Sequence, residues 1–264
     1  MEHNVIKLNF SELSPSKEFN ELVHCYWKFT IPKNYNNGLP FNYILMPENT
    51  VSIVFANLPH YQGPAYSAVR TKGLKEEIFP GSILLGIKFN PWVNVETLFD
   101  EKLKSINQIV KCSRDVQSYF EEIIPSQLEE AFNEKEFIER GLQKLVSHHQ
   151  VQFDPLVKYI CLQLSQHDKS VNEITKEIPM SIRPIQKQFK KITGLTMVEF
   201  RNIERLRASS KKIFYNKKGL SDTALEHGFT DHAHFIHSFQ KYMLDVSMKT
   251  ILAQTEIMNF TFAK

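Results

Sequence analysis

The chain has 264 residues, which is enough for two ordinary domains or one large one. Apolar residues make up 42% and charged residues 23%, so a packed core is expected and extensive disorder is excluded. No apolar run is long enough to span a membrane, no secretory signal is apparent, and the three cysteines lie far apart. These features predict a cytoplasmic protein without a disulfide framework.

Charge is distributed unevenly along the chain. Residues 1–150 contain 15 Lys and Arg against 18 Asp and Glu, a net charge of −3, whereas residues 151–264 contain 17 against 11, a net charge of +6. Residues 180–220 alone contain eleven basic and two acidic residues. Such a concentration is typical of a solvated helical face or of a surface that binds a polyanion, and the surrounding pattern favours the second.

The first 110 residues predict a β-rich domain. Short runs rich in β-branched and aromatic residues, at 41–46, 50–55 and 83–89, are separated by turn-forming residues. The turn at 47–49 predicts a hairpin between the first two runs. Several short strands at this spacing are typical of a sandwich or a barrel.

Residues 113–150 change character and predict two or three helices. Apolar residues recur there at helical spacing, glycine and proline are few, and Pro125 is expected to begin a new helix after a turn. These helices could pack on the β-rich part, bridge to the next domain, or pair with a second subunit. We therefore expect residues 1–150 to form a sensor or self-association domain with a helical segment at 113–150.

The last 110 residues contain a repeat. Segments 171–189 and 220–239 each predict a short helix, a tight turn and a second helix. A small residue, Thr175 or Ala224, precedes each turn and allows the two helices to approach closely. This layout predicts two helix-turn-helix units, and a longer helix at about 197–215 would fix their separation near one turn of DNA.

Ordered motifs accompany the two units. The first unit contains Ser181-x-Arg183-x-Ile185-Gln186-Lys187-x-Phe189-Lys190-Lys191-x-x-Gly194, followed by Phe200-x-x-x-x-Arg205-Leu206-x-x-Ser209. The second contains Ser221-Asp222-x-Ala224-x-x-x-Gly228-Phe229-x-Asp231-x-x-His234-Phe235-x-x-x-Phe239-x-Lys241. With these motifs, the last 105 or so residues resemble the DNA-binding domain of the AraC/XylS family of bacterial transcription regulators. The N-terminal half resembles an uncharacterised domain attached to some of these regulators, in His24-Cys25-Tyr26-Trp27, Met46-Pro47-Glu48-Asn49 and the segment at 85–91.

The resemblance implies an α+β protein. Residues 1–150 would form the β-rich, sandwich-like or barrel-like domain with helices, and residues 154–258 an all-α DNA-binding domain. Its helix-turn-helix units, at about 171–192 and 220–243, would be joined by the long helix. The implied function is sequence-specific regulation of transcription, with the two units reading adjacent major grooves and the N-terminal domain binding an effector or mediating dimerisation.

The implied partners follow from that function. Double-stranded promoter DNA is the main one, and RNA polymerase, an unidentified small-molecule effector and a second copy of the chain are further candidates. No membrane partner and no cofactor are expected.

Three departures from the family pattern leave a second function open. Pro179 stands where the family has glycine in the turn of the first unit, and residues 244–248 lack the family's glycine and proline. The second unit also carries much less positive charge, so we expect the first unit to supply most of the affinity. The alternative is a protein-interaction module with weak, non-specific DNA binding.

The DNA contacts are expected on the second helix of each unit. Arg183 suits the edge of guanine and Gln186 that of adenine, although both could be ordinary solvated side chains. Lysines of the same helix suit phosphates, while Ile185 and Phe189 are expected in the core. The predicted DNA-binding residues are Ser181, Arg183, Gln186, Lys187, Lys190, Lys191, His232, His234, His237 and Lys241.

The sequence gives little support for a metal site or an enzyme, and it leaves an effector pocket open. The three histidines of the second unit do not share one helix face and have no cysteine nearby, so no metal site is predicted. No nucleophile, phosphate-binding or dinucleotide motif occurs, so no enzyme is predicted. Aromatic residues of the β-rich part could line an effector pocket or simply form core; the candidates are Trp27, Tyr43, Phe55, Phe89 and Trp92.

Overall fold

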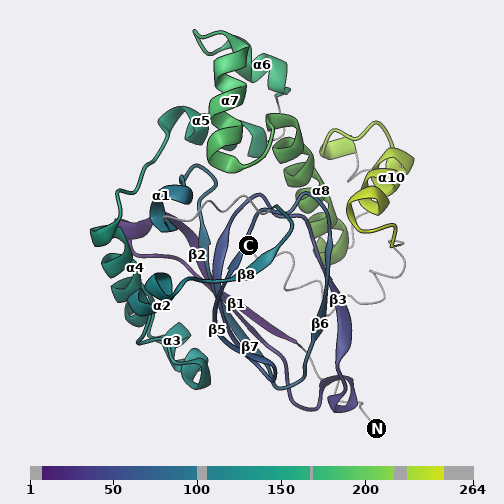
Figure 1. Ribbon diagram of the computed structural model, residues 1–264. Helices are drawn as coiled ribbons and strands as arrows, with labels where there is room; N and C mark the ends of the chain where they lie inside the picture. Colours follow the sequence, from purple (N-terminus) through teal and green to yellow (C-terminus); the bar gives the residue numbers. More distant parts are fainter. Residues whose placement is uncertain (1–7, 100–105, 167–168, 217–224, 247–264) are drawn as a thin grey trace.

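The computed structural model describes residues 8–99, 106–166, 169–216 and 225–246, which form a β-rich N-terminal part followed by helices (Figure 1). The predicted α+β architecture is therefore confirmed. All three cysteines are buried thiols that belong to no disulfide. Within these described ranges, no helix is long and apolar enough to cross a membrane.

Two sheets make up the β-rich part. The larger is antiparallel, with six strands in the order β1 (Asn9–Leu13), β2 (Val23–Thr30), β7 (Ile83–Phe89), β4 (Ser52–Leu58), β5 (Tyr61–Ser67) and β8 (Ile109–Lys111). The smaller pairs β3 (Phe41–Leu45) with β6 (Leu74–Ile78). Figure 1 shows this two-stranded ribbon facing the larger sheet, as the two walls of an open, flattened barrel.

Helices cover the outer face of the larger sheet. After α1 (Glu96–Phe99), the segment predicted to be helical forms α2 (Arg114–Tyr119), α3 (Leu128–Asn133) and α4 (Glu136–His148), with a short 3-10 turn that begins at Pro125. Their buried side chains, such as Phe120 and Leu142, share one core with Phe55 and Phe89 of the sheet. Of the three placements left open by the sequence, the structure shows these helices packed on the β-rich part.

Five described helices follow: α5 (Pro155–Ser165), α6 (Val171–Lys176), α7 (Ile182–Thr193), α8 (Met197–Asn216) and α10 (His232–Tyr242). Their ends follow from local sequence. The side chain of Asp154 caps α5 by accepting from the backbone N–H of Val157 at 3.0 Å. Ser170 and Glu173 form a capping box on α6, and Gly194, at φ +74°, ends α7 in the left-handed conformation.

The predicted hairpin at 47–49 is wrong. β3 pairs with β6, whereas β4 pairs with β5 and β7, so this segment crosses from one sheet to the other. Two backbone hydrogen bonds between Glu48 and Arg70, of 2.9 and 2.8 Å, fix the crossing. A turn between two apolar runs shows that the chain changes direction but does not show which strands then pair.

The crossover segment, residues 46–49, docks on α8. Asn49 donates from its side-chain amide to the carbonyl of Phe200 at 3.1 Å and to Glu204 at 2.9 Å. Met46 is buried in the core formed by α8 and α10. The N-terminal and C-terminal parts of the chain therefore share hydrophobic cores as well as hydrogen bonds.

Glu48 forms ion pairs with two other elements at this junction. Its carboxylate lies 2.9 Å from the ammonium of Lys88 on β7 and 3.3 Å from the guanidinium of Arg207 on α8. Burial alone would raise the pKa of Glu48, but Arg207, Lys88 and Arg70 together hold that pKa far below its ordinary value. Because the cations favour the ionised form, the folded state depends on Glu48 being charged.

We expect Glu48→Gln to lower the free energy of unfolding by about 3 kcal/mol at pH 7, because the variant leaves the buried cations without their carboxylate. Since folding lowers the pKa of Glu48 from its ordinary 4.5, this stabilisation is fully present above that pH and is lost as the pH falls below it. Denaturant unfolding at several pH values measures both effects.

The matched control is Glu122→Gln, which removes a carboxylate that pairs with Arg140 on the exposed surface and should change stability little. An equal difference between wild type and Glu48→Gln at pH 3 and at pH 7 would contradict the assignment of the stabilisation to the charge of Glu48.

Candidate DNA-binding surface and effector cavity

The first helix-turn-helix unit consists of α6, α7 and the turn between them. Thr175, on α6, is only 8% exposed, in keeping with a close contact between the two helices. No residue from 177 to 181 has a positive φ, so the turn that contains Pro179 is built without a left-handed residue, as the proline predicts. The backbone N–H of Met180 donates to the carbonyl of Ile178 at 2.7 Å and closes the turn.

α7 presents one polar face to solvent. Its apolar residues Ile185 and Phe189 are fully buried, so the opposite face points away from the core. Ser181 occupies the N-cap position, although its side chain makes no capping hydrogen bond. The structure brings six predicted DNA-binding residues together on this exposed face, at the tip of the molecule in Figure 1: Ser181, Arg183, Gln186, Lys187, Lys190 and Lys191.

The second unit is described from residue 225 onward, so Ala224 and the first helix of this unit lie outside the described residues. On α10, His232, His237 and Lys241 are exposed. His234 is also exposed, but its ring nitrogen Nδ1 lies 3.1 Å from the hydroxyl of Thr230 and so takes part in the N-terminal turn of α10. In the described part of the chain, no group of three or more His, Cys, Asp or Glu could hold a metal ion.

Sequence reasoning missed the roles of two arginines in the basic run. The guanidinium of Arg205 donates to the carbonyls of His227 and Gly228 and lies over the ring of Phe229, with 4.4 Å between the centres. It therefore ties α8 to the turn of the second unit. Arg207 donates to the carbonyl of Pro47 at 3.0 Å besides its ion pair with Glu48.

Both arginines are therefore engaged inside the protein, and the net charge of the run overstates the charge that faces solvent. The signal that could have pointed to these roles is the family motif itself. It includes Arg205 and, in the N-terminal half, the four residues of the crossover segment.

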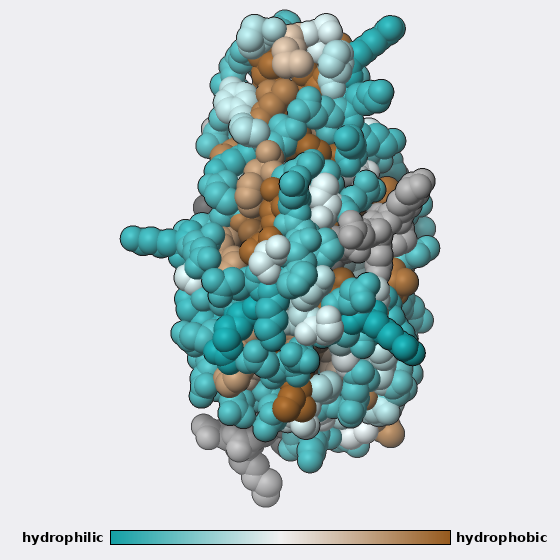
Figure 2. Space-filling model, turned by 60° about the vertical axis from the view of Figure 1, so that its left-hand side comes forward, coloured by the Kyte–Doolittle hydropathy of each residue, from teal (hydrophilic) through white to brown (hydrophobic). Residues whose placement is uncertain are grey.

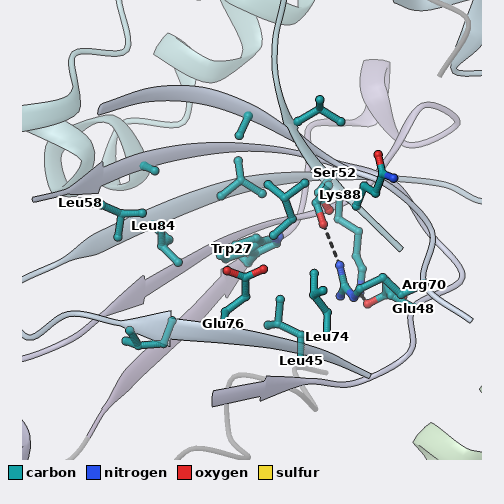
Figure 3. Close-up of a pocket in the computed structure, with 18 of the residues that line it drawn as sticks. Trp27, Leu45, Glu48, Ser52, Leu58, Arg70, Leu74, Glu76, Leu84 and Lys88 are labelled. Atoms are coloured by element: carbon teal, nitrogen blue, oxygen red, sulfur yellow. Dashed lines mark hydrogen bonds and ion pairs between the residues drawn. The ribbon is translucent and has the colours of Figure 1, made fainter. Parts of the chain in front are cut away.

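A cavity of about 820 Å³ lies between the two sheets. Successive residues of a strand point to opposite faces, so Val54, Ala56 and Leu58 line the cavity while their neighbours on β4 face the helices. Figure 3 shows Leu45 and Leu74 on the opposite wall. The cavity is therefore a second interior, separate from the core beneath α2–α4.

Only one of the five aromatic residues predicted to bind an effector lines this cavity, and it is Trp27. Phe55 and Phe89 point to the other face of the sheet, and Tyr43 is buried in the core between ribbon and sheet. Trp92 donates to the carbonyl of Glu21 at 3.1 Å, away from the cavity. The spacing of aromatic residues alone could not show which face of each strand would border the cavity.

Charged groups gather at one end of the cavity. Figure 3 shows Glu48, Arg70 and Lys88 together there, and Glu76 pointing into the middle of the cavity beside Trp27. Arg70 is only 8% exposed and donates to the carbonyl of Met46 at 3.2 Å and to the hydroxyl of Ser67 at 2.7 Å. Burial raises the pKa of Glu76, and nearby Arg70 opposes that rise.

The outer surface of α2–α4 carries ion pairs. Arg140 lies 2.7 Å from Glu122, and Lys144 lies 3.4 Å from Glu121. The lower half of the face in Figure 2 is predominantly hydrophilic, whereas an apolar stripe runs over the upper half. The charged surface of these helices is typical of a solvated face.

One family of known sequences matches the C-terminal part of the chain. Residues 174–245 match the family described as "Helix-turn-helix domain". The search of curated proteins gave no match.

Several crystal structures of ToxT from Vibrio cholerae are similar to the chain over nearly its whole length. An apo form of a ToxT variant has 13% identity and a TM-score of 0.47, covering 96% of this chain and 99% of that one. Wild-type ToxT bound to an unsaturated fatty acid has 14% identity and a TM-score of 0.45, covering 96% and 97%.

The family match spans α7, α8 and α10, and it includes the exposed face of α7 described above. A domain of this kind supports a DNA-binding transcription regulator. The C-terminal part of the chain is an AraC-type helix-turn-helix domain.

Proposed function

We propose that the protein is a sequence-specific regulator of transcription whose helix α7 enters a major groove of promoter DNA. The observation that carries this proposal is the exposed face of α7, held in place by the buried Ile185 and Phe189. Arg183 and Gln186 lie near the N-terminal end of α7, where recognition helices contact base edges. Lys187 and Lys190 continue the same exposed face toward the phosphates.

α10 makes the second contact with DNA in this proposal. α8 has 20 residues, so it is about 30 Å long, close to the roughly 34 Å that separate successive major grooves on one side of DNA. α10 offers Lys241 and the exposed His232 and His237 to the backbone or bases. Because α7 carries more basic residues, it supplies most of the affinity.

The cavity between the two sheets is the proposed effector site. One of its lining residues, Arg207, belongs to α8, so an occupant would contact both the β-rich part and the DNA-binding part. Contact with RNA polymerase and pairing of two copies of the chain stay predictions from the sequence.

The alternative function is a protein-interaction module with weak, non-specific DNA binding. The low positive charge of the second unit favours it. Titration with salt tests the two functions, using DNA from upstream of the protein's own coding region and a scrambled duplex of equal length. A preference of about 10³ or more supports the regulator, and about six phosphate contacts predict a log–log salt slope near −5. Equal affinity for both duplexes would favour the alternative.

We expect Arg183→Ala and Gln186→Ala each to weaken binding to the specific duplex by about tenfold to a hundredfold, because each removes a bidentate contact with a base. Binding to scrambled DNA should change far less. Equal losses on both duplexes would show that these residues do not read bases. Arg140→Ala, on the exposed surface of α4, is the control and should change neither affinity.

We expect Lys190→Ala to act differently, because its ammonium is assigned to a phosphate. It should weaken binding to both duplexes by similar factors and reduce the magnitude of the salt slope by about one. Fluorescence anisotropy at a series of salt concentrations measures the slope. An unchanged slope would remove Lys190 from the set of phosphate contacts.

A further inference from the structure

The connection between α4 and α5, residues 149–154, is held on the β-rich part just before α5 begins. The carbonyl of Gln152 accepts from the backbone N–H of Asn94 at 3.2 Å. Phe153 forms an antiparallel bridge with Val93, in the same loop after β7. The end of this connection is therefore fixed against the β-rich part.

The first turn of α5 is attached to the same region. The ammonium of Lys158 lies 2.6 Å from the carboxylate of Glu21 and 5.4 Å from the centre of the Trp92 ring. Trp92 in turn donates to the carbonyl of Glu21. The start of α5 therefore keeps a defined position relative to the β-rich part.

Asp154, the last residue of the connection, contacts two helices at once. One carboxylate oxygen, Oδ1, accepts from the backbone N–H of Val157 and caps α5. The other, Oδ2, accepts from the side-chain amide of Gln188 on α7. Gln188 is half-buried on the flank of α7, whereas its neighbour Lys187 is on the exposed face. The carboxylate thus joins the fixed connection to the helix that carries most of the predicted DNA contacts.

We infer that Asp154 is a positioning residue for DNA recognition, and that through Gln188 it sets the orientation of α7 relative to the β-rich part. This inference rests on the proposed function, because it gives a role in base recognition to a residue outside the exposed face of α7. It adds a second attachment of the first unit to the β-rich part, separate from α8 and from the cavity.

The contact supplies what the core of the first unit lacks. Ile185 and Phe189 hold α7 by apolar packing, which is non-directional and opposes rotation of the helix about its axis only weakly. A hydrogen bond to an ionised carboxylate is directional and stronger than one between neutral groups. Bidentate contacts of Arg183 and Gln186 with base edges require a defined rotation of α7.

A second contact of α5 with the first unit is more exposed. The hydroxyl of Tyr159 donates to Glu177, at the end of α6, at 2.8 Å, and Glu177 also pairs with Lys169 at 2.7 Å. Solvent and salt weaken such a surface ion pair. The partly buried hydrogen bond between Asp154 and Gln188 therefore contributes more to the position of the unit.

Three variants separate capping from positioning. Asp154→Ser keeps a good N-cap for α5, but the shorter side chain does not reach Gln188. Asp154→Asn keeps both contacts, because its amide caps α5 and hydrogen-bonds to Gln188 once the glutamine amide turns over. Gln188→Ala removes the contact from the α7 side and leaves the cap intact.

Fluorescence anisotropy with the full chain and the two duplexes described above measures recognition. Asp154→Ser and Gln188→Ala should each weaken binding to the specific duplex by about fivefold to tenfold and change binding to the scrambled duplex less than about twofold. Asp154→Asn should bind as wild type does. The double variant should lose no more than either single variant, because both substitutions remove the same contact.

A measurement without DNA tests the orientation itself. Spin labels on Gln143→Cys of α4 and Lys191→Cys of α7, both exposed positions, report the distance between the β-rich part and α7 by electron–electron resonance. The three native thiols are buried and therefore protected from the label. The distance distribution should shift or broaden in Asp154→Ser and Gln188→Ala and stay as in wild type in Asp154→Asn.

Gln117→Ala is the matched control. Gln117 is also a helical glutamine that donates a hydrogen bond, to the carbonyl of Cys112 at 2.8 Å, but it lies on α2. Its substitution should change neither the DNA affinities nor the distance between the labels.

Several outcomes would overturn the inference: an unchanged distance distribution in both Asp154→Ser and Gln188→Ala, equal losses on both duplexes, additive losses in the double variant, or unaltered binding to the specific duplex despite a shifted distance. Intact sequence preference of the wild type in these cases would leave the proposed function standing. The expected shift in distance, together with wild-type binding that lacks sequence preference, would support the attachment of α7 through Asp154 and reject both the regulator and the role in base recognition.

Discussion

The carboxylate of Glu48 joins three parts of the structure that are distant in the sequence. It lies on the crossover between the two sheets and accepts from Lys88 on β7 and Arg207 on α8. Because the crossover also supplies Met46 to the core of the second helix-turn-helix unit, its position fixes α8 against the β-rich part. The cavity and the DNA-binding helices therefore share one buried charge group, and neither can be rearranged without affecting it.

The two interiors of the β-rich part follow from the alternation of side chains along each strand. On β4, Phe55 faces the helices and contributes to a continuous core, whereas Val54 and Ala56 face the cavity. Large side chains on one face and smaller ones on the other give the sheet a filled side and an open side. The ribbon of β3 and β6 faces the open side, so the space becomes a cavity between two walls rather than an exposed sheet face.

Local signals in the sequence were sufficient for most elements. The run at 83–89 is a strand, Pro125 begins a helical turn, and Gly194 ends α7, because each depends on residues close in the chain. Strand pairing across the crossover was predicted wrongly, since it depends on contacts between distant residues. Likewise, the exposed face of α7 follows from helical spacing, but the inward direction of Arg207 depends on a carboxylate 159 residues earlier in the chain, Glu48. Sequence patterns therefore predicted the exposed face of α7 better than the lining of the cavity.

α8 contacts both helix-turn-helix units and the crossover segment of the β-rich part. Its buried residues Phe200 and Ile203 pack in the core of the first unit, while Arg205 holds the turn of the second. Glu204 and Arg207 contact the crossover segment. A helix held at so many points moves as one body, so a change at the cavity end would shift both units together instead of loosening one of them. Coupling between cavity and DNA would then act through the orientation of α8, because α8 contacts the crossover, α7 and α10.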